Sequence, residues 1–217
     1  MKSLQKMGGI AALIITTTFI VGLVLNFTFL DSSGIDDPVQ MVKFLMDTQA
    51  IMYVWIMFLY VIFGIFVVFL ALALYEQLKT SSPALAQPGA VFGIIWAGLC
   101  IASGLVFNIG MGVVVDLYST DPAQAATVWL AIDPVAQGIG CAMEIPGGLW
   151  AILTSLAALQ AGKFPKALNY LGIVVGVAGL LTVIPAIYDV VMVFALGQIV
   201  WYTWLGIIML RKPNAAA

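Results

Sequence analysis

Apolar residues are concentrated in long, almost uninterrupted blocks along the chain. The blocks cover residues 8–30, 50–75, 91–115, 135–160, 168–188 and 190–210. Each block has about the twenty residues that an α-helix needs to cross roughly 30 Å of hydrocarbon. Because lipid offers the backbone no hydrogen-bond partners, these spans have to be helical. The pattern predicts an all-α fold, a polytopic membrane helix bundle with six transmembrane helices in a single domain over residues 1–217.

Composition narrows the range of functions. Charged residues make up only 8% of the 217 residues, against about 25% in an ordinary soluble domain. The eight basic residues are scattered, so the chain has no patch for a run of phosphates and we expect no nucleic-acid partner. Histidine is absent, and Cys100 and Cys141 both lie in apolar blocks. We therefore expect no metal or other cofactor, and two buried thiols, with a disulfide as the alternative.

Charges between the blocks predict the orientation. Basic residues occur in alternate connections, at Lys2, Lys6, Lys79, Lys163, Lys166, Arg211 and Lys212. The other connections hold Lys43 and the acids Asp31, Asp36, Asp37, Asp47, Asp116, Asp121 and Asp133. Because basic connections stay in the cytoplasm, we expect a multi-pass protein of the cell inner (plasma) membrane with both termini cytoplasmic. The first block is too long for a signal peptide, so it is interpreted as a membrane helix.

Two acidic connections contain the signature of a helix start. Asp37-Pro38 and Asp121-Pro122 each place an N-cap acceptor before a proline, and proline is already set to helical φ and has no amide to satisfy. The residues after Pro38 predict a short helix lying at the outer membrane surface. The alternative is an extension of the second span into water.

The chain also shows signs of internal duplication. A shift of 84 residues aligns Asp37-Pro38-x-Gln40 with Asp121-Pro122-x-Gln124, and Gly64 with Gly148. This predicts two copies of a helical hairpin, with the fifth and sixth helices as a third, shortened copy. Copies of two helices keep the same orientation, so the axis that relates them would lie along the membrane normal.

One segment resembles a known family. It consists of Gly162-Lys163-Phe164-Pro165-Lys166, Leu168, Leu171-Gly172 and Ala178-Gly179. In a six-helix chain of this length, it is similar to a widespread bacterial family of integral membrane proteins, domain of unknown function 4386. The resemblance implies the six-helix layout and a bacterial origin. It implies no catalytic residue, because the family has no established activity or site.

Glu144 is the candidate for chemistry. It lies about nine residues into the fourth predicted span, where a charge costs at least a few kcal/mol unless it is paired, hydrated or protonated. Pro146 follows, with Gly147 and Gly148, and predicts a kink beside the carboxyl group. Glu144 is interpreted as a titratable functional group. The alternative is a protonated structural residue that forms hydrogen bonds between helices.

Other polar residues are expected in the outer halves of the spans. They are Asn26, Asn108, Gln137, Asp189, Gln198 and Tyr202. Together with Glu144 they predict a ligand-binding cavity that opens outward.

The leading hypothesis is a protein that binds or moves a small molecule, proton or lipid, with membrane lipids as its other partners. The alternatives are an intramembrane enzyme using Glu144 and Asp189, and a scaffold or subunit without catalysis. Catalytic motifs are missing from the sequence, which favours a protein that is not an enzyme. The sequence leaves the oligomeric state open.

Topology gives the first testable prediction. In a background lacking Cys100 and Cys141, cysteines at Ser33 and Ser119 should react with an impermeant thiol reagent added to intact cells, whereas cysteines at Ser81 and Asn214 should not. Labelling of Asn214→Cys together with protection of Ser33→Cys would reverse the orientation.

Overall fold

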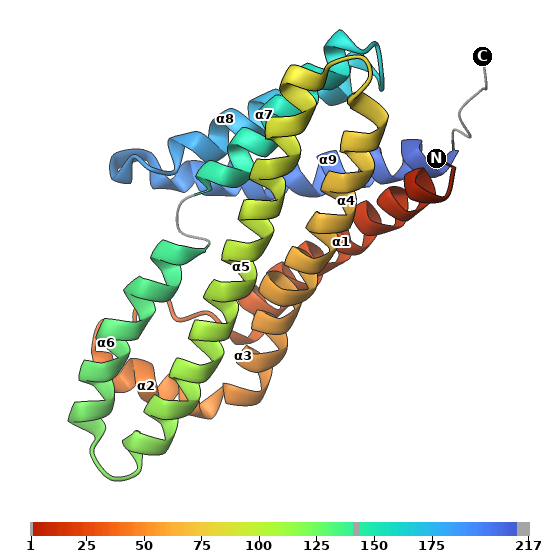
Figure 1. Cartoon of the computed structure of the whole chain (residues 1–217). Coiled ribbons are helices and arrows are strands. Elements are labelled where there is room, and N and C mark those ends of the chain that lie inside the picture. Colours follow the sequence, from red (N-terminus) through yellow and green to blue (C-terminus); the bar gives the residue numbers. More distant parts are fainter. Residues whose placement is uncertain (1, 141–143, 212–217) are drawn as a thin grey trace.

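Every regular element in the described part of the chain is a helix. The computed structural model describes residues 2–140 and 144–211 (Figure 1). The elements are α1 (Lys2–Phe29), α2 (Pro38–Asp47), α3 (Gln49–Ile56), the π-helix η1 (Met57–Ile62), α4 (Phe63–Leu78), α5 (Pro83–Tyr118), α6 (Pro122–Ile139), α7 (Ile145–Gln160), α8 (Lys166–Leu181), the 3-10 helix η2 (Pro185–Val190) and α9 (Val191–Arg211). The all-α prediction is confirmed for these residues.

Four stretches of helix are long and apolar enough to cross a membrane: Ser3–Phe29, Gln49–Leu78, Pro83–Tyr118 and Pro185–Arg211. Helices α7 and α8 are apolar but have 16 residues each, which is about 24 Å at 1.5 Å per residue. That is shorter than the roughly 30 Å hydrocarbon core. The long apolar helices identify a membrane protein, and the number of six crossings stays a prediction.

The fourth predicted span, 135–160, is wrong as a single helix. Helix α6 ends at Ile139 and α7 begins at Ile145. The two helices pack in succession along α5, so together they run back beside it (Figure 1). Pro146 explains why a new helix starts here, because its ring clashes with the carbonyl of the residue four positions earlier and it is tolerated in a first turn.

The fifth predicted span, 168–188, is also too long. Helix α8 ends at Leu181, and residues Pro185–Val190 form the separate 3-10 helix η2. The hairpin of α8 and α9 therefore has a short helical connection at its tip, where the sequence pattern had predicted continuous membrane helix.

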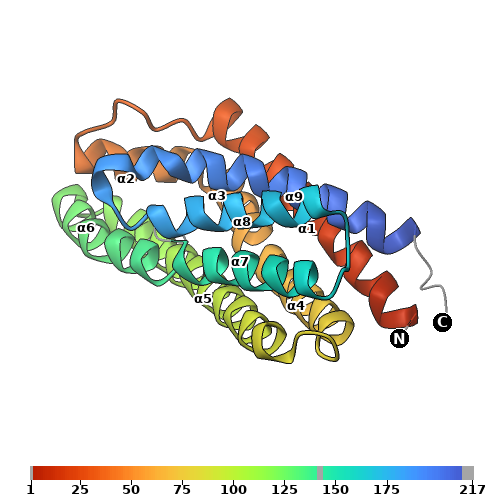
Figure 2. The ribbon, with the colours of Figure 1, turned by 90° about the horizontal axis from the view of Figure 1, so that it is seen from above.

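Six helices close into a ring. Each of α1, α4, α5, α7, α8 and α9 packs against the next, and α9 packs against α1; Figure 2 shows α8 between α7 and α9. Glycines occupy matching contacts between hairpins. A methyl group added at Gly93 would meet Trp150 of α7 and Ala71 of α4. One at Gly172 would meet Ser155 of α7 and Trp201 of α9, and one at Gly9 would meet α9. These contacts support the three-hairpin repeat, which stays a prediction.

Aromatic side chains fill the interior of this ring. Trp96 lies 5.9 Å, between ring centroids, from both Trp150 and Phe194, and 4.9 Å from Phe63. Trp150 in turn lies 5.7 Å from Trp201. All five side chains are buried. The middle of the bundle is therefore a packed core.

Both Asp-Pro helix starts are confirmed. The Asp37 carboxylate accepts a hydrogen bond from the Val39 amide at 2.9 Å and begins α2. The Asp121 carboxylate accepts one from the Gln124 amide at 2.9 Å and begins α6. Helix α2 is a separate ten-residue element that packs against α5 and α6, so it is not an extension of the second span.

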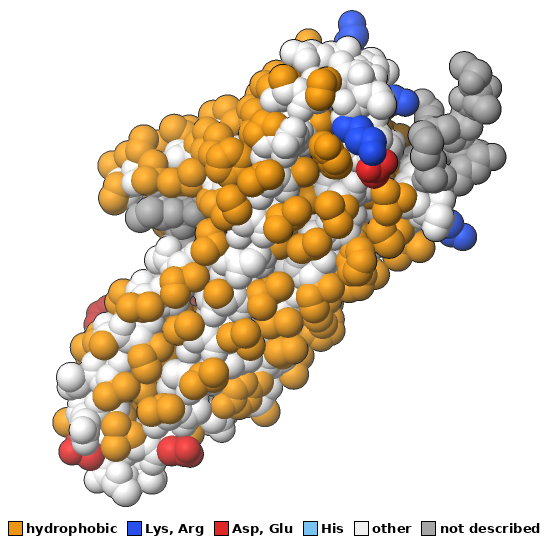
Figure 3. All heavy atoms as spheres, viewed as in Figure 1, with side chains coloured by type: hydrophobic (Ala, Val, Ile, Leu, Met, Phe, Trp, Pro, Cys, Tyr) orange, Lys and Arg blue, Asp and Glu red, His pale blue; other side chains and the backbone are white. Residues whose placement is uncertain are grey.

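Charges separate to opposite ends of the molecule. Figure 3 shows Lys and Arg side chains gathered at one end, with an acidic side chain beside them, and other Asp or Glu side chains at the opposite end, with a largely hydrophobic surface between the two ends. The basic end contains the turns after α4 and α7. This separation agrees with the sequence pattern, while the orientation in the membrane stays a prediction.

Close glycine packing gives the second testable prediction. A methyl group at Gly148 would lie 2.6 Å from the Gly176 carbonyl oxygen of α8, whereas one at Gly98 of α5 would meet nothing within 4 Å. Gly148→Ala should lower the free energy of unfolding by about 1–3 kcal/mol through overpacking. Gly98→Ala is the matched control and should not destabilise, because alanine favours helix over glycine by about 1 kcal/mol. Equal unfolding of the two variants in a dodecyl sulfate titration would contradict this packing.

Candidate functional site

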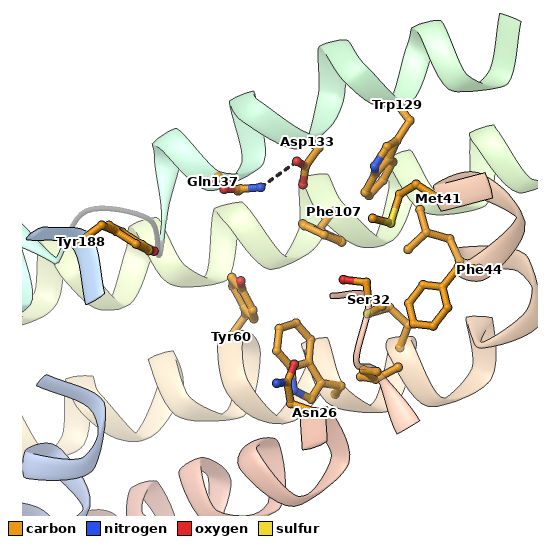
Figure 4. Close-up of a pocket in the computed structure, with 14 residues that line it drawn as sticks. Asn26, Ser32, Met41, Phe44, Tyr60, Phe107, Trp129, Asp133, Gln137 and Tyr188 are labelled. Carbon is orange, nitrogen blue, oxygen red and sulfur yellow. Dashed lines mark hydrogen bonds between the residues drawn. The ribbon is translucent and has the colours of Figure 1, made fainter. Parts of the chain in front are cut away.

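A cavity lies at the acidic end of the bundle, between α1, α2, α3, α5 and α6 (Figure 4). Its volume is about 330 Å³, within the range of roughly 300–1,000 Å³ that small-molecule sites occupy. The lining residues are Asn26, Leu30, Ser32, Met41, Phe44, Leu45, Met52, Trp55, Tyr60, Phe107, Trp129, Asp133, Gln137 and Tyr188. We call this space the outer pocket.

Aromatic rings form much of the wall of the outer pocket. Phe107 of α5 and Trp129 of α6 pack edge to face with centroids 5.1 Å apart. Across the pocket, the Trp55 and Tyr60 rings lie 5.9 Å apart. The Trp55 indole donates a hydrogen bond to the Gly22 carbonyl at 3.0 Å, so α3 is tied to α1 and this wall is held in place.

Polar groups converge on the pocket from two sides. Asp133 and Gln137 lie one turn apart on α6, and the Gln137 amide donates to the Asp133 carboxylate at 2.7 Å (Figure 4). Asn26 at the end of α1 and Ser32 in the following connection face them from the other side. Among the described lining residues, Asp133 is the one charged side chain. An apolar wall with a few convergent polar groups is typical of a ligand site.

The predicted site residues do not all meet in this cavity. Asn26 and Gln137 line it. Asn108, Glu144, Asp189, Gln198 and Tyr202 do not belong to its wall. The expectation of one cavity around Glu144 is therefore corrected: the outer pocket holds two of the seven predicted residues and acquires Asp133 as its carboxylate.

Glu144 lies in the packed interior, where it joins three helices. Its carboxylate accepts a hydrogen bond from the Trp96 indole of α5 at 2.9 Å, and its backbone amide donates to the Thr182 hydroxyl after α8 at 2.9 Å. Its carbonyl accepts the Gly148 amide of α7 at 2.7 Å. Glu144 is 7% exposed. This geometry matches the structural alternative in which Glu144 holds helices together.

Gln198 and Tyr202 are fully buried in the aromatic core. Neither the Gln198 amide group nor the Tyr202 hydroxyl has a hydrogen-bond partner among the residues that the structure describes. Buried polar groups of this kind are usually paired by protein or ordered water. Their place is the core around Trp150, from which Tyr202 is separated by 6.1 Å between ring centroids.

The proposed carboxylate pair finds no support. Asp189 is exposed on η2, whereas Glu144 is buried, and no hydrogen bond joins them within the described ranges. No group of three potential metal ligands occurs among the described residues. Cys100 is buried, and Cys141 lies outside the described residues, so the disulfide alternative is not tested.

Two side chains were not identified from the sequence, the Trp96 indole that binds Glu144 and the Asp133 carboxylate in the pocket wall. Trp96 is 48 residues from Glu144, and nothing in the local pattern distinguishes it from another apolar core residue. Asp133 was assigned to an outer connection, yet it lies inside α6 and faces the pocket. Its spacing of four residues from Trp129 and Gln137 places all three on one helix face, and this spacing is the signal that could have identified it.

The fold and pocket define a class: an all-α membrane protein with an aromatic-lined, acidic cavity at one end of its bundle. The comparison with family models is more specific. The model described as Domain of unknown function (DUF4386) matches residues 7–212, so the chain belongs to that family. No curated protein and no solved structure matches the chain.

The hydrogen bond between Trp96 and Glu144 gives the third testable prediction. Glu144→Leu should destabilise the protein by about 1–3 kcal/mol, because it leaves the buried indole N–H of Trp96 without an acceptor. Glu144→Gln keeps an acceptor oxygen and should cost less. In a Trp96→Phe background, Glu144→Leu should lose most of its effect. Equal losses in both backgrounds, measured by unfolding in mixed micelles, would show that the hydrogen bond does not stabilise the fold.

Proposed function

We propose that this protein binds a small molecule in the outer pocket, on the extracytoplasmic side of a bacterial inner membrane. The observation that carries the proposal is the cavity of about 330 Å³ whose aromatic wall holds, among the described lining residues, a single carboxylate, that of Asp133. Its polar groups come from α1, the following connection and α6, so a ligand would contact parts of the chain that are far apart in sequence.

The charge distribution supports this orientation. Lys and Arg side chains gather at the end opposite the pocket (Figure 3), with Lys43 of α2 as the exception on the side of the pocket. Basic connections remain on the cytoplasmic side of bacterial inner membranes. The termini are then cytoplasmic, and the pocket faces the outside. Exposed apolar residues on the sides of the helices, such as Phe27, Ile109 and Val174, would contact membrane lipids.

The packed interior favours binding over an open channel. Tyr188 of η2 lines the pocket, while Trp96, Trp150 and Trp201 fill the ring of helices. A solute passing from the pocket to the basic end would have to displace these buried rings. Transport would therefore require a rearrangement of the core, whereas binding in the outer pocket requires none.

Native mass spectrometry of the purified protein gives the fourth testable prediction. We expect a non-protein mass to remain bound to the wild type. Ser32→Trp should eliminate it, because Ser32 lines the pocket and a large side chain there would occupy the ligand's volume.

Ser33→Trp is the matched control. Ser33 is the exposed neighbour and does not belong to the pocket wall, so this variant should keep the bound mass. Absence of any bound mass in the wild type, or its retention in Ser32→Trp, would count against ligand binding in the outer pocket.

A further inference from the structure

We infer that the outer pocket selects a small organic cation, a ligand that carries an ammonium group; this inference rests on the proposed function. The pocket wall combines one carboxylate, Asp133, with the rings of Phe44, Trp55, Tyr60, Phe107, Trp129 and Tyr188. It contains no Lys or Arg among the described lining residues. An anion would therefore meet the Asp133 charge without compensation.

The aromatic wall is suited to a cation. The faces of Trp, Tyr and Phe rings attract cations through their quadrupoles, and Trp does so most strongly. Two rings pack on each side of the pocket, Phe107 with Trp129 and Trp55 with Tyr60. Such paired walls can surround a methylated ammonium group, which is too weakly hydrated to require many hydrogen-bond acceptors. The Asp133 carboxylate supplies the opposite charge.

The surroundings of the pocket carry the same sign of charge. The acidic end has seven aspartates, from Asp31 to Asp133, and Lys43 is its one base in the sequence. Lys43 is paired with Asp47 at 2.6 Å, and this hydrogen bond raises the pKa of the Lys43 ammonium. Hydrogen bonds from Ser33 keep the pKa of Asp31 below its usual range. The resulting negative field concentrates cations at the pocket mouth and repels anions.

Asp133 is also held in position for this role. The Gln137 amide donates to one of its oxygens, Oδ2, at 2.7 Å. The structure shows no salt bridge to Asp133 among the described residues. The Asp133 carboxylate is thus oriented by an amide, and no base among the described residues is paired with it.

The fifth testable prediction uses choline and its uncharged isostere 3,3-dimethylbutan-1-ol, titrated by calorimetry into the full-length protein in maltoside detergent. Choline should bind at least about tenfold more tightly than the isostere. Asp133→Asn should remove this preference while keeping the size of the side chain. Asp36→Asn is the control, because it removes the same charge from the acidic end without touching the pocket wall, and should keep the preference.

The outcomes separate this inference from the proposed function. Equal binding of choline and the isostere would overturn cation selectivity but leave the outer pocket as a ligand site. If Asp36→Asn and Asp133→Asn lose the preference for choline equally, the pocket itself is not what selects the cation. If neither compound binds, the cation inference fails, and the Ser32→Trp comparison still decides whether the pocket holds a ligand.

The ammonium group could belong to a free solute or to a lipid headgroup. Choline binding should be measured in nanodiscs of phosphatidylcholine and of an uncharged glycolipid without an ammonium group, because an anionic lipid would itself concentrate choline at the membrane surface. Weaker binding in phosphatidylcholine would assign the pocket to the headgroup through competition, and equal binding would assign it to the free solute.

Discussion

Glu144 lies where the bundle changes from a closed ring of helices to an end with fewer helices, and its hydrogen bonds hold the helices together at this place. Three helices meet there, because the Glu144 carboxylate is bound by Trp96 of α5 and its amide by Thr182 after α8, while α7 begins at the next residue. On one side of this point, α7 belongs to the closed ring with an aromatic core. On the other side, α6 packs against α5 and α2.

This change of organisation makes room for the outer pocket. The hairpin of α8 and α9 has only the short η2 at its tip, and Tyr188 of η2 borders the pocket. The other two hairpins extend further, through α2 and α6, and enclose the cavity from the sides. The ring has a packed interior, and its acidic end has fewer helices, so the cavity lies at the acidic end.

Many local features could be predicted because they depend on neighbouring residues. The N-caps at Asp37 and Asp121 need only an acceptor followed by proline, and both are present as predicted. The block 135–160 could not be delimited in this way. Hydropathy averages over a window and does not show that Pro146 would open a new helix instead of bending an existing one.

The sequence by itself determined that the protein lies in lipid, that its two ends carry opposite charges, and where several of its helices start. These features depend on composition and on short-range pattern. Only the tertiary structure decided that Glu144 pairs with Trp96, and that Asp133 faces Asn26 and Tyr60 across a cavity. The physical reason is that helical periodicity indicates which face of a helix is buried, but not which distant residue packs against that face.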